Sequence, residues 1–112
     1  MSLPSEINPH LVAASGAYTI SRSVRLRSSA SAYFSRTPAS AGSLTTWTWS
    51  GWIKRGTLGA SQAIFSSGTS AITLVHFQAD NTLRIRNSTV EYVTTQVFRD
   101  PSAWYHIVVQ WN

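Results

Sequence analysis

The chain has 112 residues, contains no cysteine and carries a formal net charge of +5. This length allows one domain with one modest hydrophobic core, and the lack of cysteine excludes disulfide bonds and cysteine-based zinc sites. The excess of arginine over acidic residues suits an anionic partner such as nucleic acid, an acidic glycan, a lipid surface or an acidic protein. The sequence shows no signal peptide and no apolar run long enough for a transmembrane helix, so we expect a protein made in a cytoplasm.

Residues 1–21 are expected to form an extended N-terminal arm. Pro4 and Pro9 disfavour a regular helix or a central strand, and the segment shows no apolar periodicity. A disordered terminus and an anchor that becomes ordered against a partner both fit this composition. In the second interpretation, the side chains that anchor the arm to its partner are Ile7, Leu11, Val12, Tyr18 and Ile20.

Residues 22–112 have the pattern of a β-rich domain. Short runs of alternating apolar and polar residues follow one another, separated by turn residues such as Asp80, Asn81 and Pro101. None of the segments has helical periodicity. About eight short strands at this spacing predict an all-β fold, an antiparallel β-sandwich or a barrel. The expected strands are residues 22–27, a short strand from 33, and residues 45–54, 62–66, 71–78, 82–86, 90–98 and 104–111.

The strand at residues 45–54 is expected to lie at the centre of the sandwich. Alternation places Trp47 and Trp49 on one face, whereas Trp52 breaks the alternation. Gly51 would allow a bulge that turns Trp52 towards the same core. The odd positions of residues 104–111 supply a second apolar face. The predicted structural core therefore consists of Trp47, Trp49, Trp52, Tyr105, Ile107, Val109 and Trp111.

Catalytic and metal-binding patterns are not recognisable. The four acidic residues are scattered along the sequence, whereas a glycosidase needs two carboxylates that face each other across a cleft. His10, His76 and His106 lack the spacing of metal ligands, and the sequence has no Gly-x-Ser-x-Gly motif around a nucleophile. We therefore expect a protein that is not an enzyme and that binds neither a metal nor a cofactor.

A surface for a ligand or partner is expected on the later strands. Arg84 and Arg86 share one face of a strand, where they could contact phosphate groups while nearby aromatic rings stack on bases. A solvated strand face that discourages edge pairing explains the same two arginines. The candidate surface comprises Arg84, Arg86, Tyr92, Trp104 and His106.

Four segments resemble the concanavalin A-like, laminin-G-like jelly-roll domains of tailed bacteriophage virion proteins. Residues 24–36 are similar to the opening hairpin of that family, and residues 46–54 to its central tryptophan strand. Residues 62–65 are similar to its next short strand, and residues 104–109 to its Trp-x-His strand. The resemblance implies that residues 22–112 form an antiparallel jelly-roll sandwich that serves adhesion or decoration.

Two features depart from that family. Members that bind calcium use acidic loop residues, whereas the matching hairpin here has serines, which again predicts no calcium. The family also continues after the Trp-x-His strand into a further hairpin, whereas this sequence ends at Asn112. We therefore expect either the ordered part of a longer protein or a subunit whose sandwich is completed by a neighbour in a homo-oligomer.

The expected function is that of a non-enzymatic virion structural protein of a phage, as a tail, fibre or head-surface decoration component. Such a protein would mediate attachment or particle assembly, with the arm contacting other virion proteins and the sandwich contacting a host surface glycan. We expect neither a membrane nor a nucleic-acid partner. A carbohydrate-binding module of an extracellular enzyme or adhesin is the alternative, and a basic nucleic-acid-binding β-barrel is a third. The missing signal peptide favours a virion over a secreted module.

Overall fold

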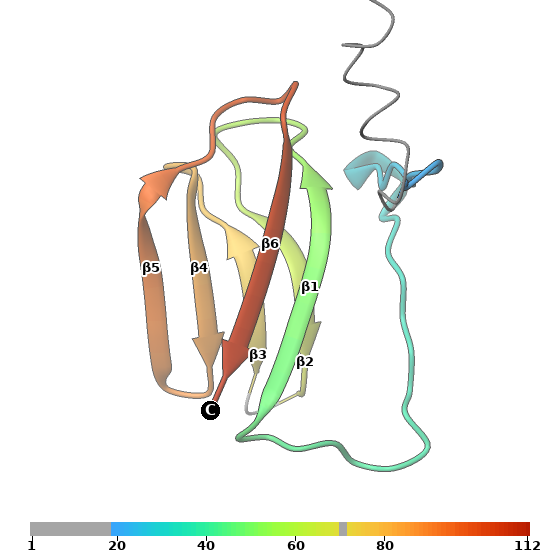
Figure 1. Cartoon of the computed structure of the whole chain (residues 1–112), viewed down its shortest axis with the longest axis vertical. Helices are drawn as coiled ribbons and strands as arrows, with labels where there is room; N and C mark the ends of the chain where they lie inside the picture. The colour runs from blue at the N-terminus through green and yellow to red at the C-terminus, as the bar shows by residue number, and fades with distance from the viewer. Residues whose placement is uncertain (1–18, 70–71) are drawn as a thin grey trace, which may run out of the picture. The chain divides into compact units, whose positions relative to one another are not determined.

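The computed structural model describes residues 19–69 and 72–112, and the chain divides between Ala41 and Gly42 into two units (Figure 1). The strands all belong to the second unit. They are β1 (Trp47–Lys54), β2 (Gln62–Ser67), β3 (Thr73–Phe77), β4 (Thr82–Asn87), β5 (Val90–Val97) and β6 (Trp104–Trp111). No helix within the described ranges has the length and apolar character needed to cross a membrane.

The described part of the first unit, residues 19–41, contains one short 3-10 helix, η2 (Ser28–Ala30), and no strand. The sequence predicts strands at residues 22–27 and from Tyr33 onwards, and both predictions are wrong. Alternation supplies a face to bury, but a strand also needs a hydrogen-bonding partner, and residues 22–27 pair with no strand of the described structure. Val24 and Leu26 are therefore exposed.

The expected N-terminal arm lies almost wholly outside the described residues. Of its anchoring side chains, only Ile20 is described, and it is exposed. Ile7, Leu11, Val12 and Tyr18 fall outside the described ranges. The anchoring role of the arm therefore stays a prediction.

Two antiparallel sheets form the second unit (Figure 1). β1 pairs with β6, and the other four strands are hydrogen-bonded in the order β2-β3-β4-β5. The two-stranded sheet lies in front of the four-stranded sheet, and β5 lies beyond β6 with neither β1 nor β6 in front of it (Figure 1). The predicted all-β, antiparallel architecture is confirmed and is consistent with a β-sandwich. A jelly roll consists of eight strands in two Greek keys, and this topology stays a prediction.

Short polar turns connect the strands of the four-stranded sheet. Between β3 and β4, Asn81 has a φ of 71°, and the Asp80 carboxylate accepts hydrogen bonds from the backbone N–H and the hydroxyl of Thr82. Between β4 and β5, Ser88 has a φ of 56°. Aspartate and asparagine suit such turns because they bond to nearby backbone and tolerate left-handed conformations. The turn predicted at Asp80 and Asn81 is therefore formed.

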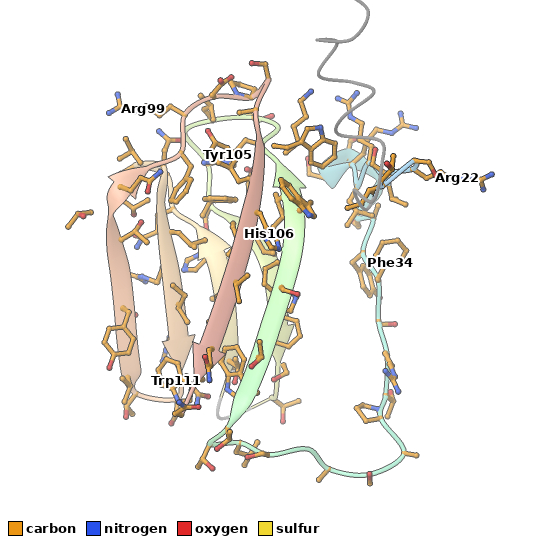
Figure 2. The ribbon with its side chains drawn as sticks, viewed as in Figure 1. Arg22, Phe34, Arg99, Tyr105, His106 and Trp111 are labelled. Atoms are coloured by element: carbon orange, nitrogen blue, oxygen red, sulfur yellow. The ribbon has the colours of Figure 1, made fainter. Side chains whose placement is uncertain are left out.

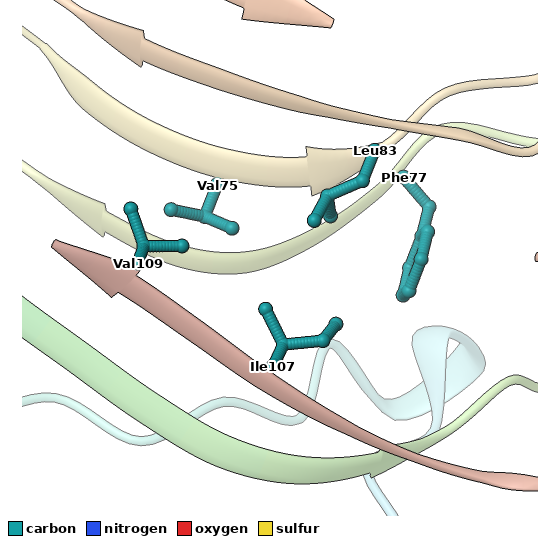
Figure 3. Close-up of a cluster of buried hydrophobic side chains, with 5 residues drawn as sticks. All are labelled: Val75, Phe77, Leu83, Ile107 and Val109. Carbon is teal, nitrogen blue, oxygen red and sulfur yellow. The ribbon is translucent and has the colours of Figure 1, made fainter. Parts of the chain in front are cut away.

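A small cluster of buried side chains joins the two sheets (Figure 3). Alternation along β3 and β6 turns every second residue towards the opposite sheet. The cluster consists of Val75, Phe77, Leu83, Ile107 and Val109. Half-buried side chains pack against the cluster and enlarge it: Trp47, Trp49, Ile53, Ile64, Phe65, Ile85, Phe98 and Tyr105. At one end of the β1–β6 pair, the rings of Trp47 and Trp111 stack with their centroids 5.9 Å apart.

Strand β1 continues through Gly51 without a bulge, because its register with β6 is uninterrupted. The ring of Trp49 lies over Gly51, where an added Cβ would be 2.9 Å from the ring. Gly51 therefore makes room for an inward side chain and does not redirect the next residue. Trp52 keeps its even position in the alternation and is 52% exposed. The prediction that Trp52 belongs to the core is wrong.

Arg55, directly after β1, is a buried charged residue with only 3% of its surface exposed. Its guanidinium donates hydrogen bonds to the backbone oxygen of Phe98 at 2.9 Å and to Oε1 of Gln62 at 3.1 Å. It also reaches Oδ1 of Asn81 at 3.5 Å and lies 4.2 Å from the centroid of the Phe77 ring. Within the described ranges, no carboxylate forms an ion pair with it. The hydrogen bonds of Arg55 thus connect the end of β1 to residues of three other segments.

Candidate binding face on strands β1 and β6

The outer face of the β1–β6 sheet carries an exposed group of aromatic side chains. Because the odd positions of both strands face the other sheet, the even positions face outwards. The cross-strand pairs on this side include Trp52 with His106 and Lys54 with Trp104. These four residues are termed the aromatic face below. Figure 2 shows the position of His106 on β6.

Two ring contacts organise the aromatic face. The indole of Trp52 and the imidazole of His106 stack with their centroids 4.7 Å apart and an angle of 14° between the planes. The Nζ atom of Lys54 lies 6.0 Å from the centroid of the Trp104 ring, within the range of a cation–π contact. Trp52 and Trp104 nevertheless remain 52% and 49% exposed. The cross-strand contacts therefore restrict the orientation of the rings without covering them.

This arrangement suits a ligand with one weakly polar face. The face of an aromatic ring is electron-rich and attracts partially positive hydrogen atoms, such as the C–H groups on one side of a sugar ring. Lys54 supplies hydrogen-bond donors beside the rings, and Ser50 and Gln110 occupy outward positions further along the same two strands. Exposed tryptophans on one sheet face, beside a charged side chain, are candidates for contact with a ligand. The aromatic face can thus combine stacking with a few hydrogen bonds.

The five residues predicted to form a ligand surface lie in three places. Trp104 and His106 belong to the aromatic face. Tyr92 lies opposite Ile85 in the β4–β5 register, which places it on the inner side of the four-stranded sheet. Its ring centroid is 5.6 Å from that of Trp111. Tyr92 therefore cannot share a ligand with the arginines of the neighbouring strand, which face the other way.

Arg84 and Arg86 lie on the outer face of the four-stranded sheet. The Nε atom of Arg84 is 3.1 Å from Oε1 of Glu91, which lies on the adjacent strand. The Nε atom of Arg86 donates a hydrogen bond to the backbone oxygen of Ser88 at 2.9 Å. Arg84 is thus paired with a charge on the adjacent strand, and Arg86 is bonded to the turn between β4 and β5. This observation fits the interpretation of a solvated strand face better than that of a phosphate-binding surface.

A hydroxyl–imidazole pair also lies on the outer side of the four-stranded sheet. The Oγ atom of Ser61 is 3.0 Å from Nδ1 of His76, and His76 is the cross-strand partner of Arg84. Burial lowers the pKa of His76, the positive charge of Arg84 lowers it further, and Glu91 opposes both effects. A lowered pKa makes the imidazole a weaker base. We therefore interpret the pair as a structural contact and not as an activated nucleophile.

Lowering the pH from about 7.5 to about 5.5 is expected to reduce the free energy of unfolding through His76. The pKa of His76 in the folded protein lies below its value in the unfolded chain, about 6.5. The unfolded chain therefore binds protons more readily, so stability is lost as the pH falls through the unfolded pKa, and the loss ends below the folded pKa. Urea denaturation at the two pH values measures the change. An equal pH dependence in His76→Gln, which keeps a partner for Ser61, would contradict this assignment.

Of the described acidic side chains, Glu91 pairs with Arg84, whereas Asp80 and Asp100 serve local turns. Within the described ranges, no group of three or more His, Cys, Asp or Glu side chains could hold a metal ion. Hydrogen bonds from Thr82 lower the pKa of the Asp80 carboxyl, and hydrogen bonds from Ser102 lower the pKa of the Asp100 carboxyl. Both carboxylates are therefore engaged in capping turns.

Two members of the aromatic face were not expected from the sequence as surface residues. Trp52 was assigned to the core and Lys54 was not singled out. The signal was present, because Trp52 and Lys54 continue the even positions of Thr48 and Ser50. An uninterrupted alternation through Gly51 would have placed both on the outer face.

Comparison with known proteins adds no relative. No family model, no curated protein and no solved structure matches this chain. A proposal of function therefore depends on the fold, on the aromatic face and on the resemblance of the four sequence segments.

Proposed function

We propose that this chain is a non-enzymatic structural protein of a phage virion, a tail, fibre or head-surface component that acts in attachment or particle assembly. In this proposal, the aromatic face holds a saccharide of the host surface. The proposed saccharide binding is supported by one observation: Trp52 and Trp104 are about half exposed on the same sheet face. A folded domain does not need to expose two such rings side by side, and burying them against a ligand would be favourable.

The resemblance to phage jelly-roll domains supports the virion part of the proposal. Three of the four similar segments coincide with strands of the structure: residues 46–54 with β1, residues 62–65 with β2, and residues 104–109 with β6. β1 and β6 are also paired with each other, so the segments that resemble the tryptophan strand and the Trp-x-His strand lie in one sheet. The fourth segment, residues 24–36, forms no strand and gives no such support.

A carbohydrate-binding module of an extracellular enzyme or adhesin is the second candidate, because the same aromatic face would serve it. The two candidates differ in where the protein is found. Neighbouring reading frames that encode phage structural proteins, together with detection of the chain in purified particles, would support the virion proposal. Neighbouring reading frames for secreted hydrolases would favour the module.

Substitution of either exposed tryptophan is expected to weaken saccharide binding at least about tenfold, since the loss of a contact worth about 1.4 kcal/mol has this effect. A glycan array identifies the ligand, and calorimetry compares the parent with Trp52→Ala and Trp104→Ala. Both residues are about half exposed, so the variants should remain folded. Tyr33→Ala is the matched control, because Tyr33 is an exposed aromatic residue outside the aromatic face.

The outcomes of this experiment separate the candidate functions. Saccharide binding that survives both tryptophan substitutions would show that the aromatic face is not the site. Absence of any saccharide ligand, combined with DNA binding whose affinity falls steeply with salt, would favour the basic nucleic-acid-binding protein.

A further inference from the structure

A groove runs along the edge of β6 that faces away from β1. In the described structure, β6 pairs with β1 alone, so its second edge has no strand beside it. The four-stranded sheet extends past this edge (Figure 1). The resulting groove has a volume of about 270 Å³ and is lined by Ile85, Tyr92, Val108, Val109, Gln110 and Trp111.

The floor of the groove is an inner sheet face that remains exposed. Tyr92 lies on the same side of the sheet as the half-buried Ile85, yet it is 62% exposed. Val90, two residues earlier on β5, is 46% exposed. Inner faces of a sandwich are normally covered by the opposite sheet. The two-stranded sheet thus lacks the width to cover its partner.

The open edge of β6 also lacks the features that usually prevent strand addition. Proteins protect exposed edges with charged residues, prolines or bulges. Strand β6 contains no lysine, acidic residue or proline, and its register with β1 is regular from Trp104 to Trp111. An extended segment with alternating apolar residues could therefore add to this edge and cover the floor of the groove.

A segment of the chain itself has the complementary pattern. In residues 22–27, Val24 and Leu26 occupy one face, and Arg25 and Arg27 occupy the other. Val24 is 68% exposed and Leu26 is 51% exposed. The segment ends at Arg27, which has an extended backbone and directly precedes η2 (Ser28–Ala30). In the part of the chain that the structure describes, residues 22–27 thus have a strand-like sequence but no paired strand, and one edge of β6 has no strand beside it.

We propose that residues 22–27 of one copy of this chain add as a strand to the open edge of β6 in a second copy. Val24 and Leu26 would cover the exposed inner face at Tyr92, while Arg25 and Arg27 stay in solvent. Each copy carries one donor segment and one acceptor edge, so two copies can exchange strands reciprocally in a closed dimer, and a contact that does not close in this way builds a larger ring or a filament. This inference specifies a contact through which copies of the chain would assemble, as the proposed function requires. It does not depend on saccharide binding.

Mixing two defective variants tests the proposal. The donor variant carries Val24→Asp and Leu26→Asp, and the acceptor variant carries Tyr92→Asp. All three residues are exposed, so both variants should keep the far-ultraviolet circular dichroism and the melting temperature of the parent. Size-exclusion chromatography with light scattering should show concentration-dependent oligomers for the parent and monomers for each variant alone. An equimolar mixture should give a one-to-one dimer, because one intact donor then meets one intact acceptor.

Matched controls place substitutions on the opposite faces of the same segments. Ser23→Asp should leave association unchanged, because Ser23 alternates with Val24 and lies on the face of Arg25 and Arg27. Val93→Asp on β5 should also leave it unchanged, because Val93 pairs with the outward Arg84. A monomeric parent at all concentrations would overturn the proposal. Failure of the mixture to form dimers, or oligomers that persist in the donor variant, would also overturn it. None of these outcomes affects the saccharide measurements with Trp52→Ala and Trp104→Ala.

Discussion

Replacement of Arg55 by alanine is expected to lower the free energy of unfolding by about 1–3 kcal/mol through the lost hydrogen bonds, and further through the lost packing against Phe77. The substitution leaves the backbone oxygen of Phe98 and the side-chain oxygens of Gln62 and Asn81 without their donor. It also opens space beside the Phe77 ring, which Arg55 covers at 4.2 Å. Unsatisfied buried acceptors and a cavity both destabilise the folded state. Urea denaturation monitored by circular dichroism measures the change.

Two further variants of Arg55 separate packing from hydrogen bonding. Arg55→Met keeps an unbranched side chain against Phe77 but donates no hydrogen bond, so we expect a loss smaller than that of the alanine variant. Arg55→Lys keeps the positive charge but cannot bond to three acceptors in the planar geometry of a guanidinium. We expect the lysine variant to be destabilised more than the methionine variant. An alanine variant as stable as the parent would show that these contacts do not stabilise the fold.

Replacement of Phe77 by alanine is expected to cost about 3–5 kcal/mol, whereas Trp52→Ala should change stability far less. Phe77 is 1% exposed and lies in the cluster that joins the two sheets, with its ring centroid 5.5 Å from that of Phe98. Trp52 loses mainly its stacking contact with His106 on the outer face. The comparison is informative because the larger ring belongs to the less important position for folding.

Chemical denaturation of both variants under one set of conditions measures this difference. The slope of unfolding free energy against urea concentration should remain that of the parent, since a changed slope indicates a changed folded or unfolded state. A Trp52→Ala protein that is destabilised as strongly as Phe77→Ala would return Trp52 to the core. It would also remove the structural basis for the aromatic face.

The strands of the second unit could be predicted from the sequence because two independent signals agree there. In β4, for example, Leu83 and Ile85 alternate with polar residues, and the turn residues Asp80 and Asn81 mark its beginning. Residues 104–111 show the same agreement, with apolar odd positions after the break at Pro101. Where alternation and turn chemistry coincide, local preference and tertiary packing favour the same structure.

The structural positions of the wrongly predicted residues depend on contacts between distant segments, which a local sequence pattern does not contain. Residues 22–27 alternate as clearly as β4, but alternation does not specify which strand will pair with them. Trp52 was predicted to reach the core through a bulge at Gly51, but β1 continues without one, so the position of Trp52 in the strand determines its sheet face. Nothing in the sequence indicated that Arg55 is buried, because its hydrogen-bond acceptors on Gln62, Asn81 and Phe98 come from three separate segments.

The pairing of β1 with β6 imposes an order on folding. The hairpins that build β2, β3, β4 and β5 connect neighbours in the sequence, whereas Trp47 pairs with Trp111 only after the whole intervening chain has formed a loop. Long-range pairing is slow because the entropy of closing the loop is lost before any contact compensates for it. The local hairpins should therefore form first, and the buried cluster is completed only when Ile107 and Val109 arrive. Because Trp47 and Trp111 come together in that late step, tryptophan fluorescence in a rapid-mixing experiment should lag behind the circular dichroism of the hairpins.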